Sequence, residues 1–447
     1  MDIAIIETSS LGDRSYLVSD GEIAVVVDPQ RDIDRVLKLA AERGVTITHV
    51  LETHIHNDYV TGGLELSRAV GAEYIVPAGD DLGYPRRAVQ DGDVIDAGPF
   101  TLQVMHTPGH THHHASYVLR DGGGTAVGVF TGGSMLHGTT GRTDLLGDEH
   151  TDTLTHAQYH SVRRLADELP GSAQVYPTHG FGSFCSATQA SGDASTIADE
   201  RQTNPALTQD EQSYVDELLA GLSAYPAYYA HMGVINMAGP PPVDLSLPSP
   251  VDPHELRHRI EAGEWVVDLR TRTAFAAGHL GGTLSFELEK SFVTYLGWLY
   301  RWGAPLTLIG DDEDQIADAQ RELVRIGIDE LAGAAVGEIE QLSAATPLRS
   351  YRVVDFSDVA DRPDGATVLD VRQTGEYEDS HIPGAVNIPL HELDGRMAEV
   401  PDGEVWVHCG SGYRASVAAS MLDAAERTVV LIDDEFENAD KQGLTRP

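Results

Sequence analysis

Three side chains at alternate positions, His54, His56 and Asp58, form the first group in the sequence that could do chemistry. They directly follow the stretch 44–51, whose Val, Thr and Ile residues predict a buried strand. Imidazole and carboxylate groups are ligands for divalent transition metals. Because a loop at the end of a strand is rigidly aimed, the three groups can converge on one cation. The pattern therefore predicts a metal-binding loop.

Two further histidines, His110 and His179, also stand just after predicted strands. Loops that leave several strands at one edge of a β-sandwich can bring distant residues together on a rigid scaffold. We therefore expect His110 and His179 to join the first group in a single site.

A cysteine near the C-terminus, Cys409, is the second candidate. It follows a hydrophobic stretch and precedes a glycine-rich loop and a predicted helix that begins near Ala415. The backbone N–H groups of such a loop and the N-terminus of the helix stabilise a thiolate. That thiolate can accept an extra sulfur atom as a persulfide and pass it on. We expect Cys409 to be a nucleophile whose substrate is bound by the loop residues Gly410, Ser411, Gly412 and Tyr413.

The first 44 residues contain sequence signals for a β-hairpin and a helix. Hydrophobic runs at 15–18 and 23–27 flank Asp20-Gly21, which predicts a β-hairpin. Apolar residues at helical spacing in the stretch 31–43, followed by Gly44, predict a helix.

The second half of the chain contains a repeat. Val267-Asp268-Leu269-Arg270 and Leu369-Asp370-Val371-Arg372 match, and in both copies a histidine follows the aspartate by 11 positions and a glycine by 14. A repeat of this length indicates duplicated domains rather than a solenoid. We predict two α/β domains at 254–345 and 350–447, preceded by a stiff proline-rich linker at 236–253.

Composition and charge limit the classes of partner. The 447 residues are enough for about three domains. The formal net charge of −40, from 30 Lys and Arg against 70 Asp and Glu, argues against nucleic acids and anionic membranes. The two cysteines, Cys185 and Cys409, lie far apart and argue against a disulfide framework. With no signal-peptide pattern and no spanning apolar stretch, we expect a cytoplasmic protein that acts on small molecules.

The ordered motifs of the N-terminal half resemble the metallo-β-lactamase superfamily. They are His54-x-His56-x-Asp58, Thr107-Pro108-Gly109-His110-Thr111, Phe130-Thr131-Gly132, Gly141-Arg142-Thr143-Asp144 and His179. More narrowly, they resemble its persulfide dioxygenase and hydroxyacylglutathione hydrolase branches. The resemblance implies an αββα sandwich over residues 1–235 with metal ligands drawn from His54, His56, His110, Asp58 and His179.

Two departures from the family pattern leave the metal and the reaction open. The hydrolase branch binds two zinc ions, whose shared hydroxide attacks a thioester, and has a histidine where this chain has Tyr59. The dioxygenase branch holds one Fe(II) with two histidines, matched by His54 and His110, and an aspartate where this chain has Gly133. His56 could instead complete a three-histidine set. We expect one Fe(II) per chain, with Zn(II) as the alternative.

The Cys409 loop resembles the active-site loop of rhodanese sulfurtransferases, and the stretches 370–372 and 381–389 match the same family. A cysteine-dependent phosphatase would carry its arginine six positions after the cysteine. Here that position is Ala415, and Arg414 comes one residue earlier, which gives a tighter loop suited to sulfur. The resemblance implies that Arg414 acts with Cys409 in catalysis.

The first copy of the repeat lacks this chemistry. Where the nucleophile belongs, the chain has Gly310-Asp311-Asp312, with no cysteine and with two carboxylates that would repel an anionic sulfur. We interpret this copy as an inactive rhodanese-like domain.

The chain as a whole resembles a fusion of a persulfide dioxygenase-like domain with an inactive and an active rhodanese domain. This predicts oxidation of a low-molecular-weight thiol persulfide at a mononuclear metal site, coupled to sulfur transfer through Cys409. Sulfite and thiosulfate are the other expected small-molecule partners, and the resemblance implies a homodimer. Two alternatives stay open: a metal-dependent thioester hydrolase with an accessory rhodanese, and a catalytically silent scaffold carrying a working sulfurtransferase.

Overall fold

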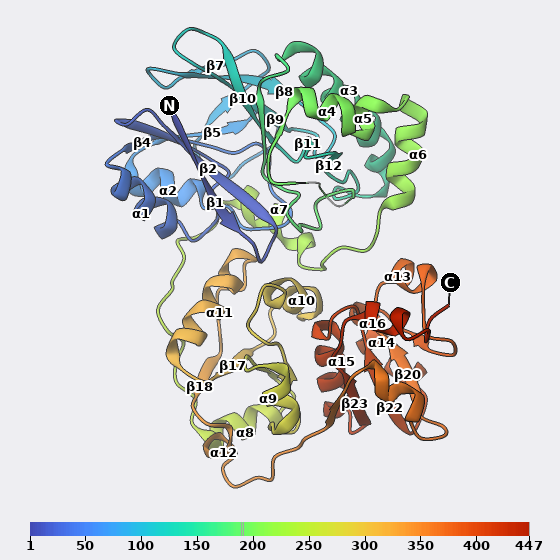
Figure 1. The fold of residues 1–447 in the computed structure, drawn as a ribbon. Helices are drawn as coiled ribbons and strands as arrows, with labels where there is room; N and C mark the ends of the chain where they lie inside the picture. Colours follow the sequence, from blue (N-terminus) through green and yellow to red (C-terminus); the bar gives the residue numbers. More distant parts are fainter. Residues whose placement is uncertain (189, 191, 447) are drawn as a thin grey trace. The chain divides into compact units, whose positions relative to one another are not determined.

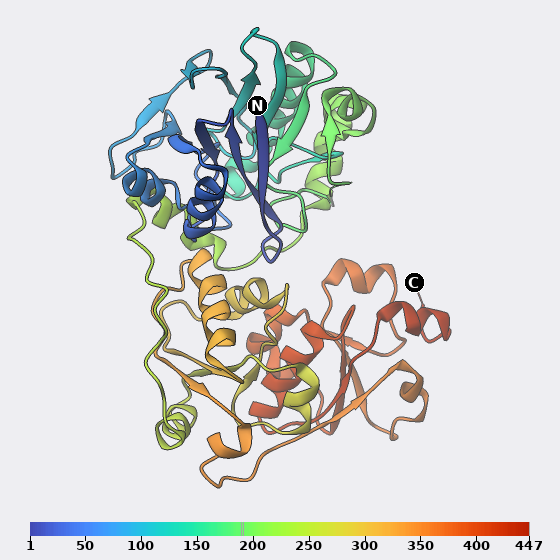
Figure 2. The same ribbon diagram turned by 60° about the vertical axis from the view of Figure 1, so that its left-hand side comes forward.

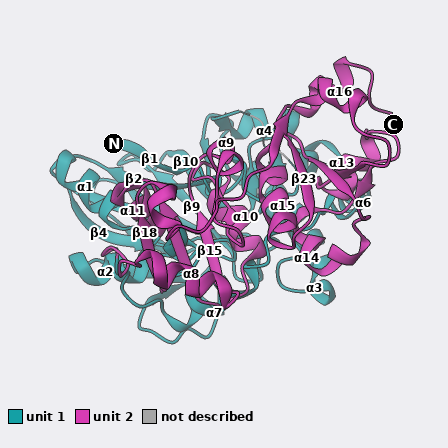
Figure 3. Cartoon of the chain, turned by 90° about the horizontal axis from the view of Figure 1, so that it is seen from below, with its two compact units in different colours: residues 1–244, 323–328 teal, residues 245–322, 329–447 magenta. Residues whose placement is uncertain are grey.

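The computed structural model describes residues 1–188, 190 and 192–446, and the chain forms two compact units (Figure 3). The N-terminal unit comprises residues 1–244 together with a short later segment, Leu323–Ile328. The C-terminal unit comprises residues 245–322 and the chain from Asp329 onward. Among the described helices, none is both long enough and apolar enough to cross a membrane.

Two six-stranded sheets form the centre of the N-terminal unit (Figures 1 and 2). In order across the first sheet lie β1 (Asp2–Thr8), β2 (Asp13–Ser19), β3 (Ile23–Val27), β4 (Thr46–Leu51), β5 (Glu73–Pro77) and β6 (Arg87–Val89). Across the second lie β14 (Ser195–Thr196), β13 (Gln174–Pro177), β10 (Ala126–Gly132), β9 (Ala115–Arg120), β8 (Thr101–His106) and β7 (Val94–Asp96). A separate pair consists of β11 (Met135–Leu136) and β12 (Thr139–Thr140).

Helices cover the outer faces of both sheets. On the first sheet pack α1 (Asp34–Arg43) and α2 (Gly63–Val70). On the second pack α3 (Asp148–Glu168), α4 (Ile197–Thr203), α5 (Pro205–Thr208) and α6 (Glu211–Gly221), and α7 (Tyr229–Ala238) follows them in sequence. A third apolar cluster, which includes Tyr16, Leu51, Phe100 and Phe130, fills the space between the sheets. These layers confirm the predicted αββα sandwich.

The local signals in the sequence explain where these elements turn and end. β2 and β3 are joined at Asp20-Gly21, where the Asp20 carboxylate accepts the N–H groups of Glu22 and Ile23 at 3.0 Å. Gly44 ends α1 in the left-handed conformation, with a φ of 66°. The predicted hairpin and helix are both confirmed.

A buried ion pair holds the later segment within the N-terminal unit. Arg325 donates to the Asp32 carboxylate at 2.7 Å, and the two side chains are 6% and 0% exposed. Burial alone would raise the pKa of Asp32, but the Arg325 guanidinium outweighs it and lowers that pKa. Breaking a buried pair by removing one partner typically costs about 3–5 kcal/mol. Arg325 is therefore a structural part of this unit, although it lies far along the chain from Asp32.

The C-terminal unit contains two parallel sheets with matching strand orders. The first consists of β16 (Leu284–Ser285), β15 (Trp265–Asp268), β17 (Leu306–Gly310) and β18 (Gly333–Val336). The second consists of β21 (Val386–Asn387), β20 (Thr367–Asp370), β22 (Glu404–His408), β23 (Thr428–Ile432) and β19 (Arg352–Val354). We call the two repeats the middle domain and the Cys409 domain. The predicted pair of α/β domains with parallel sheets is confirmed.

Helices connect the strands in both repeats (Figure 1). The middle domain contains α8 (Pro253–Glu261), α9 (Arg272–Ala277), α10 (Phe292–Leu299), α11 (Glu313–Arg325, whose last turn belongs to the N-terminal unit) and α12 (Ile339–Leu342). The Cys409 domain contains α13 (Thr374–Asp379), α14 (Leu393–Arg396), α15 (Tyr413–Ala424) and α16 (Phe436–Lys441), with short 3₁₀ helices η1 (Phe356–Asp361), η2 (Leu390–Glu392) and η3 (Met397–Glu399).

The repeated Asp and Arg residues hold the strand ends in place. Asp268 pairs with Arg270 at 2.7 Å, and Asp370 pairs with Arg372 at 2.6 Å. In each copy the arginine also donates to a backbone carbonyl eight positions later. All four side chains are buried. The repeat seen in the sequence is therefore a structural element shared by both copies.

Candidate functional site

Three histidines that follow different strands lie together in the N-terminal unit. His54 follows β4, His110 follows β8 and His179 follows β13. All three are buried, and the ring centroid of His54 lies 4.8 Å from that of His110 and 5.3 Å from that of His179. One ring nitrogen of each lies within 4.8 Å of the others. The structure thus brings the predicted histidines into one cluster.

The bonds made by Nδ1 of His54 and His110 leave Nε2 of each ring facing the cluster, where His54 Nε2 lies 3.4 Å from His179 Nε2. His110 Nδ1 lies 2.7 Å from the Arg142 carbonyl oxygen, which can only accept, so Nδ1 carries the hydrogen. Its Nε2 is buried and has no hydrogen-bond partner among the residues that the structure describes. The Thr53 hydroxyl donates to Asp28, so it accepts from His54 Nδ1 at 2.9 Å. Both rings therefore direct an Nε2 lone pair into the cluster.

Burial keeps these two rings neutral, which is the form that binds metals. Loss of solvent, followed by the effect of His179, lowers the pKa of His110 to about 3. Burial likewise holds the pKa of His54 well below its usual value. Neutral imidazoles with unshared nitrogen lone pairs are the ligand state that a divalent metal requires.

His56 and Asp58 form a second group that shares His179 with the first. One ligand atom each from His56, Asp58 and His179 lie within 4.8 Å of one another. Asp58 Oδ2 lies 3.0 Å from His179 Nδ1, whereas Asp58 Oδ1 and His56 Nδ1 are buried with no hydrogen-bond partner in the described part of the chain. All five predicted metal-site residues therefore lie in two adjoining groups.

Buried carboxylates around this cluster were missed in the sequence. His56 Nε2 lies 3.3 Å from both Asp28 and Glu52, and Asp13 lies 2.9 Å from His179 Nδ1. Burial alone would lower the pKa of His56, but Asp28 and Glu52 raise it to about 9. Carboxylates that hold the outer nitrogen of a histidine fix its orientation. Glu52, which stands directly before the histidine motif, was the one visible signal of this arrangement.

Tyr59 contacts His56 at Nε2. Its hydroxyl lies 3.0 Å from His56 Nε2, on the side of the ring where the carboxylates lie. Its ring stacks on that of His56 with centroids 4.3 Å apart. Tyr59, which stands where the hydrolase branch has a histidine, therefore orients His56, a predicted metal ligand.

Gly133 leaves no room for the aspartate found at this position in the dioxygenase branch. A Cβ atom added to Gly133 would lie 2.2 Å from Cδ2 of His110. The His110 ring thus occupies the space in which another side chain would begin. The candidate ligands of this chain therefore include more histidines than the set of two histidines and one aspartate in the dioxygenase branch.

The residues present fit a divalent transition metal. The residues of the two groups include three buried atoms that have no hydrogen-bond partner within the described residues: His110 Nε2, His56 Nδ1 and Asp58 Oδ1. Buried polar atoms without partners are costly in a folded protein unless another group satisfies them. A cation in the first group would satisfy the His110 atom, whereas the His56 and Asp58 atoms belong to the second group.

Replacing Gly133 with alanine is expected to displace His110 and lower both metal content and thermal stability. Overpacking of this kind typically costs about 1–3 kcal/mol. Metal analysis and thermal unfolding of the purified variant test this. In Gly221→Ala, where the nearest atom is 4.0 Å from the added Cβ, both quantities should stay at the parent values. Unchanged metal content in Gly133→Ala would show either that the His110 ring is not displaced or that it does not bind the metal.

The second site surrounds Cys409, which directly follows β22. The cysteine is 1% exposed, and the N–H group of Gly412 donates to its Sγ at 3.2 Å. The loop is held from outside by the Phe436 N–H group, which donates to the Gly410 carbonyl at 2.8 Å. Helix α15 begins at Tyr413, so its N-terminus adjoins the sulfur. The structure thus places the predicted nucleophile beside one backbone N–H donor and the N-terminus of a helix, an arrangement we call the Cys409 cradle.

Arg414 is fixed beside this loop by Glu376, a residue that the sequence did not single out. Its two terminal nitrogens donate to the Glu376 carboxylate at 2.6 and 2.9 Å. Burial would raise the pKa of Glu376, but Arg414 outweighs it and lowers that pKa. A bidentate pair of this kind sets the direction of the guanidinium as well as its charge.

Tyr413 points away from the loop toward the middle domain. Its hydroxyl donates to the Glu287 carbonyl at 3.2 Å, and its ring lies 5.7 Å from that of Tyr295 on α10. A second link crosses nearby, where Arg272 joins Glu287 to Asp433. The middle domain therefore contacts the loop that carries Cys409.

The middle domain has no counterpart of this nucleophile. Its strand β17 ends at Gly310, and the loop that follows contains Asp311 and Asp312. The Asp311 N–H group is bonded to the Gln315 side chain at 2.8 Å. This loop therefore lacks both a thiol and the charge suited to an anionic sulfur.

Comparison with known proteins agrees with this geometry. A family model described as the metallo-beta-lactamase superfamily matches residues 13–179, and one described as a rhodanese-like domain matches residues 355–441. The chain is 30% identical over 243 residues to the human mitochondrial persulfide dioxygenase ETHE1, which covers 53% of this chain and 82% of the relative. A Staphylococcus aureus subsp. aureus COL structure described as a metallo-beta-lactamase is 31% identical with a TM-score of 0.67, covering 75% of this chain and 99% of that one.

The chain belongs to the metallo-β-lactamase superfamily. Its N-terminal half is a homologue of persulfide dioxygenases, and its C-terminal part is a rhodanese-like domain. These assignments confirm the resemblance predicted from the motifs, and together they support an enzyme of sulfur metabolism. A hydroxyacylglutathione hydrolase from Rhizobium johnstonii is 34% identical over 123 residues, which covers 27% of this chain and 47% of the relative.

Proposed function

We propose that this chain transfers sulfane sulfur through Cys409 and oxidises a low-molecular-weight thiol persulfide at the N-terminal histidine cluster. The observation that carries the first part is the Cys409 cradle, in which Gly412 donates to Sγ and Arg414 stands beside the loop. The Gly412 N–H group, a helix N-terminus and a guanidinium all favour the anionic sulfur that attacks and is regenerated.

The transfer step follows from this arrangement. The Cys409 thiolate attacks the outer sulfur of a thiol persulfide, and a new S–S bond forms at Sγ. The S–S bond of the donor breaks, and the donor leaves as a thiolate with the electron pair. The extra sulfur on Cys409 then passes to a second thiol or to sulfite, which becomes thiosulfate.

The N-terminal cluster supports the oxidative half of the proposal. Overall, one thiol persulfide, one O₂ and one water give one thiol, one sulfite and two protons, so the outer sulfur is oxidised and O₂ is reduced. One ferrous ion would be held by His54, His110 and either His56 or His179. When bound, it would supply redox chemistry toward O₂. Asp58 and Asp13 hold His179, and Asp28 and Glu52 hold His56.

A zinc-dependent thioester hydrolase is the second candidate. Asp58 and the surrounding histidines are all in place, and a set rich in histidine suits zinc. The relationship to hydroxyacylglutathione hydrolases favours this reading, whereas Tyr59 in place of a histidine removes one ligand of a second zinc ion.

Metal analysis and O₂ uptake separate these candidates. The purified chain is reconstituted anaerobically with Fe(II) or with Zn(II), and O₂ uptake with glutathione persulfide is compared with cleavage of an acylglutathione thioester. One iron per chain with persulfide-dependent O₂ uptake and sulfite formation is the expected result. Thioester cleavage by the zinc form without O₂ uptake by the iron form would overturn the oxidative proposal in favour of the hydrolase.

A further inference from the structure

An ion pair between the middle domain and the Cys409 domain lies against the Cys409 loop. Arg272, the first residue of α9, donates through Nε to Asp433 Oδ1 at 2.8 Å. Asp433 directly follows β23, so this contact joins the two repeats. The two side chains are 26% and 13% exposed, so water and salt screen their charges only in part.

The Asp433 carboxylate packs directly on Gly412, the residue whose N–H group donates to Cys409 Sγ at 3.2 Å. A Cβ atom added to Gly412 would overlap Asp433 Oδ1 and would lie 3.2 Å from Arg272 Nε. Ordinary bond lengths along this path place the carboxylate oxygen within about 8 Å of the sulfur. A negative charge therefore stands close to the atom that must itself become anionic.

A second carboxylate beside the same loop is neutralised from within the Cys409 domain. A Cβ atom added to Gly410 would lie 3.1 Å from a terminal nitrogen of Arg414 and 4.0 Å from Glu376 Oε1. Arg414 and Glu376 pair with each other at 2.6 Å. The cation that balances Asp433 comes instead from the middle domain.

The sequence repeat shows that Arg272 belongs to the middle domain alone. Four positions after the shared aspartate stand Arg272 in one copy and Thr374 in the other, and nineteen positions after it stand Glu287 and Pro389. The Glu287 carboxylate accepts from Arg272 at 2.9 Å, and the Glu287 carbonyl accepts from the Tyr413 hydroxyl at 3.2 Å. Arg272 and Glu287 are therefore not part of the framework that the two copies share.

We propose that Arg272 is a positioning residue of the Cys409 site, through which the middle domain favours the anionic sulfur of its neighbour. Its guanidinium holds the Asp433 carboxylate on Gly412 and balances the charge of that carboxylate. Without Arg272, the negative charge would disfavour the thiolate, which is the form of a cysteine that attacks. The proposal rests on the sulfur transfer proposed for Cys409, and it gives the cysteine-less domain a part in that reaction.

Replacing Arg272 with glutamine tests the proposal. Alkylation of Cys409 by iodoacetamide, a neutral reagent, is followed at pH 7 by mass spectrometry, and kcat/KM is measured for sulfur transfer from thiosulfate to cyanide. Both rates should fall about tenfold in Arg272→Gln, as expected for one unbalanced charge at this distance. Arg272→Lys keeps the charge and should react near the parent rates. Parent rates in Arg272→Gln would overturn the proposal.

A second substitution separates charge from structure. When Arg272→Gln is combined with Asp433→Asn, the carboxylate is gone, and both rates should return toward the parent values. If Arg272 were only a structural link, the double variant would be as slow as Arg272→Gln, and that result would overturn the proposal. Asp433→Asn alone should react at least as fast as the parent, since its guanidinium partner is then unbalanced. A slower reaction of Asp433→Asn would overturn the proposal even if Arg272→Gln does not fold.

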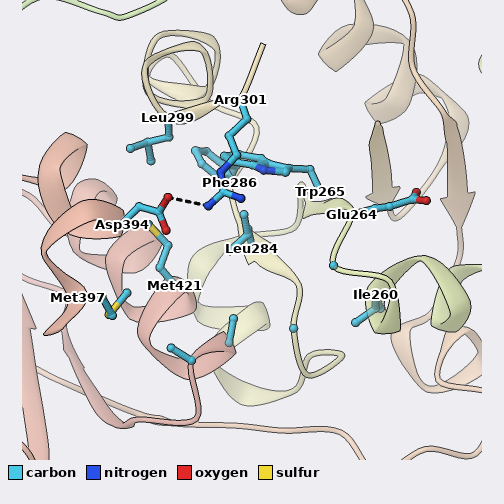
Figure 4. Close-up of a pocket in the computed structure, with 14 residues that line it drawn as sticks. Ile260, Glu264, Trp265, Leu284, Phe286, Leu299, Arg301, Asp394, Met397 and Met421 are labelled. Carbon is cyan, nitrogen blue, oxygen red and sulfur yellow. Dashed lines mark hydrogen bonds and ion pairs between the residues drawn. The ribbon is translucent and has the colours of Figure 1, made fainter. Parts of the chain in front are cut away.

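Arg301→Gln is the matched control. Arg301 also pairs across the two domains, with Asp394 at 2.7 Å, beside an apolar cavity of about 420 Å³ (Figure 4). These side chains are 70% and 62% exposed, and such exposed pairs contribute little. The variant should react at the parent rates, and an equal loss in it would overturn the proposal by assigning the effect to net charge. A parent chain that transfers no sulfur would overturn the function of Cys409 instead, whereas the iodoacetamide series would still test Arg272.

Discussion

Replacing Cys409 with serine is expected to lower sulfur transfer from thiosulfate or a thiol persulfide to cyanide by at least about 1,000-fold, since a neutral hydroxyl is a far weaker nucleophile than a thiolate. Serine is close to cysteine in size and can still accept the Gly412 N–H group that now bonds to Sγ. The fold should therefore be retained. Steady-state cyanide assays, together with mass spectrometry of the sulfur-loaded protein, measure the loss.

Cys185 supplies the matched control, because it is the only other cysteine in the chain. It is fully buried in the N-terminal unit. Cys185→Ala should keep sulfur transfer near the parent rate and should still accept a sulfur atom on Cys409. If Cys409→Ser retained transfer while Cys185→Ala lost it, the assignment of the nucleophile would be wrong.

Replacing His110 with alanine is expected to weaken metal binding by more than about 100-fold, since even outer residues that only orient ligands commonly contribute 10–100-fold. The change removes the Nε2 atom that is buried without a partner and the bond from Nδ1 to the Arg142 carbonyl. Metal content after equilibration with limiting Fe(II) or Zn(II) measures the effect, with circular dichroism to check the fold.

His106→Ala is the control for that experiment. His106 ends β8 and is exposed, so its removal takes away a histidine close in sequence without touching the cluster. It should bind metal as the parent does. Equal metal content in the two variants would show that the ion is held elsewhere.

Much of this architecture could be predicted because its signals are local. Asp20-Gly21 and Gly44 end their elements through their own backbone preferences, so nearby residues were enough to predict the hairpin and the helix. The repeated Asp268 and Asp370 pair with arginines only two positions away, which made the duplication visible. The metal cluster was predictable because its histidines follow strands in recognisable motifs.

The parts that the sequence did not reveal depend on contacts between distant segments. Asp28 and Glu52 meet at His56 only after β3 and β4 pair, and nothing in the sequence around Asp28 marks it as a partner of His56. Glu376 reaches Arg414 across 38 positions. The sequence showed that Gly133 stands where the dioxygenase branch has an aspartate. That the His110 ring fills the space beside Gly133 depends on packing between distant segments, so it could not be predicted.

The segment Leu323–Ile328 has a consequence for how this chain can be divided. A fragment that ends within the proline-rich stretch would keep Asp32 and lose Arg325, so this buried carboxylate would lose one of its guanidinium partners and keep Arg35. No single cut of the chain yields both units whole, because one unit is interrupted by the other. A gene truncated after residue 244 would therefore encode the N-terminal unit without its segment Leu323–Ile328.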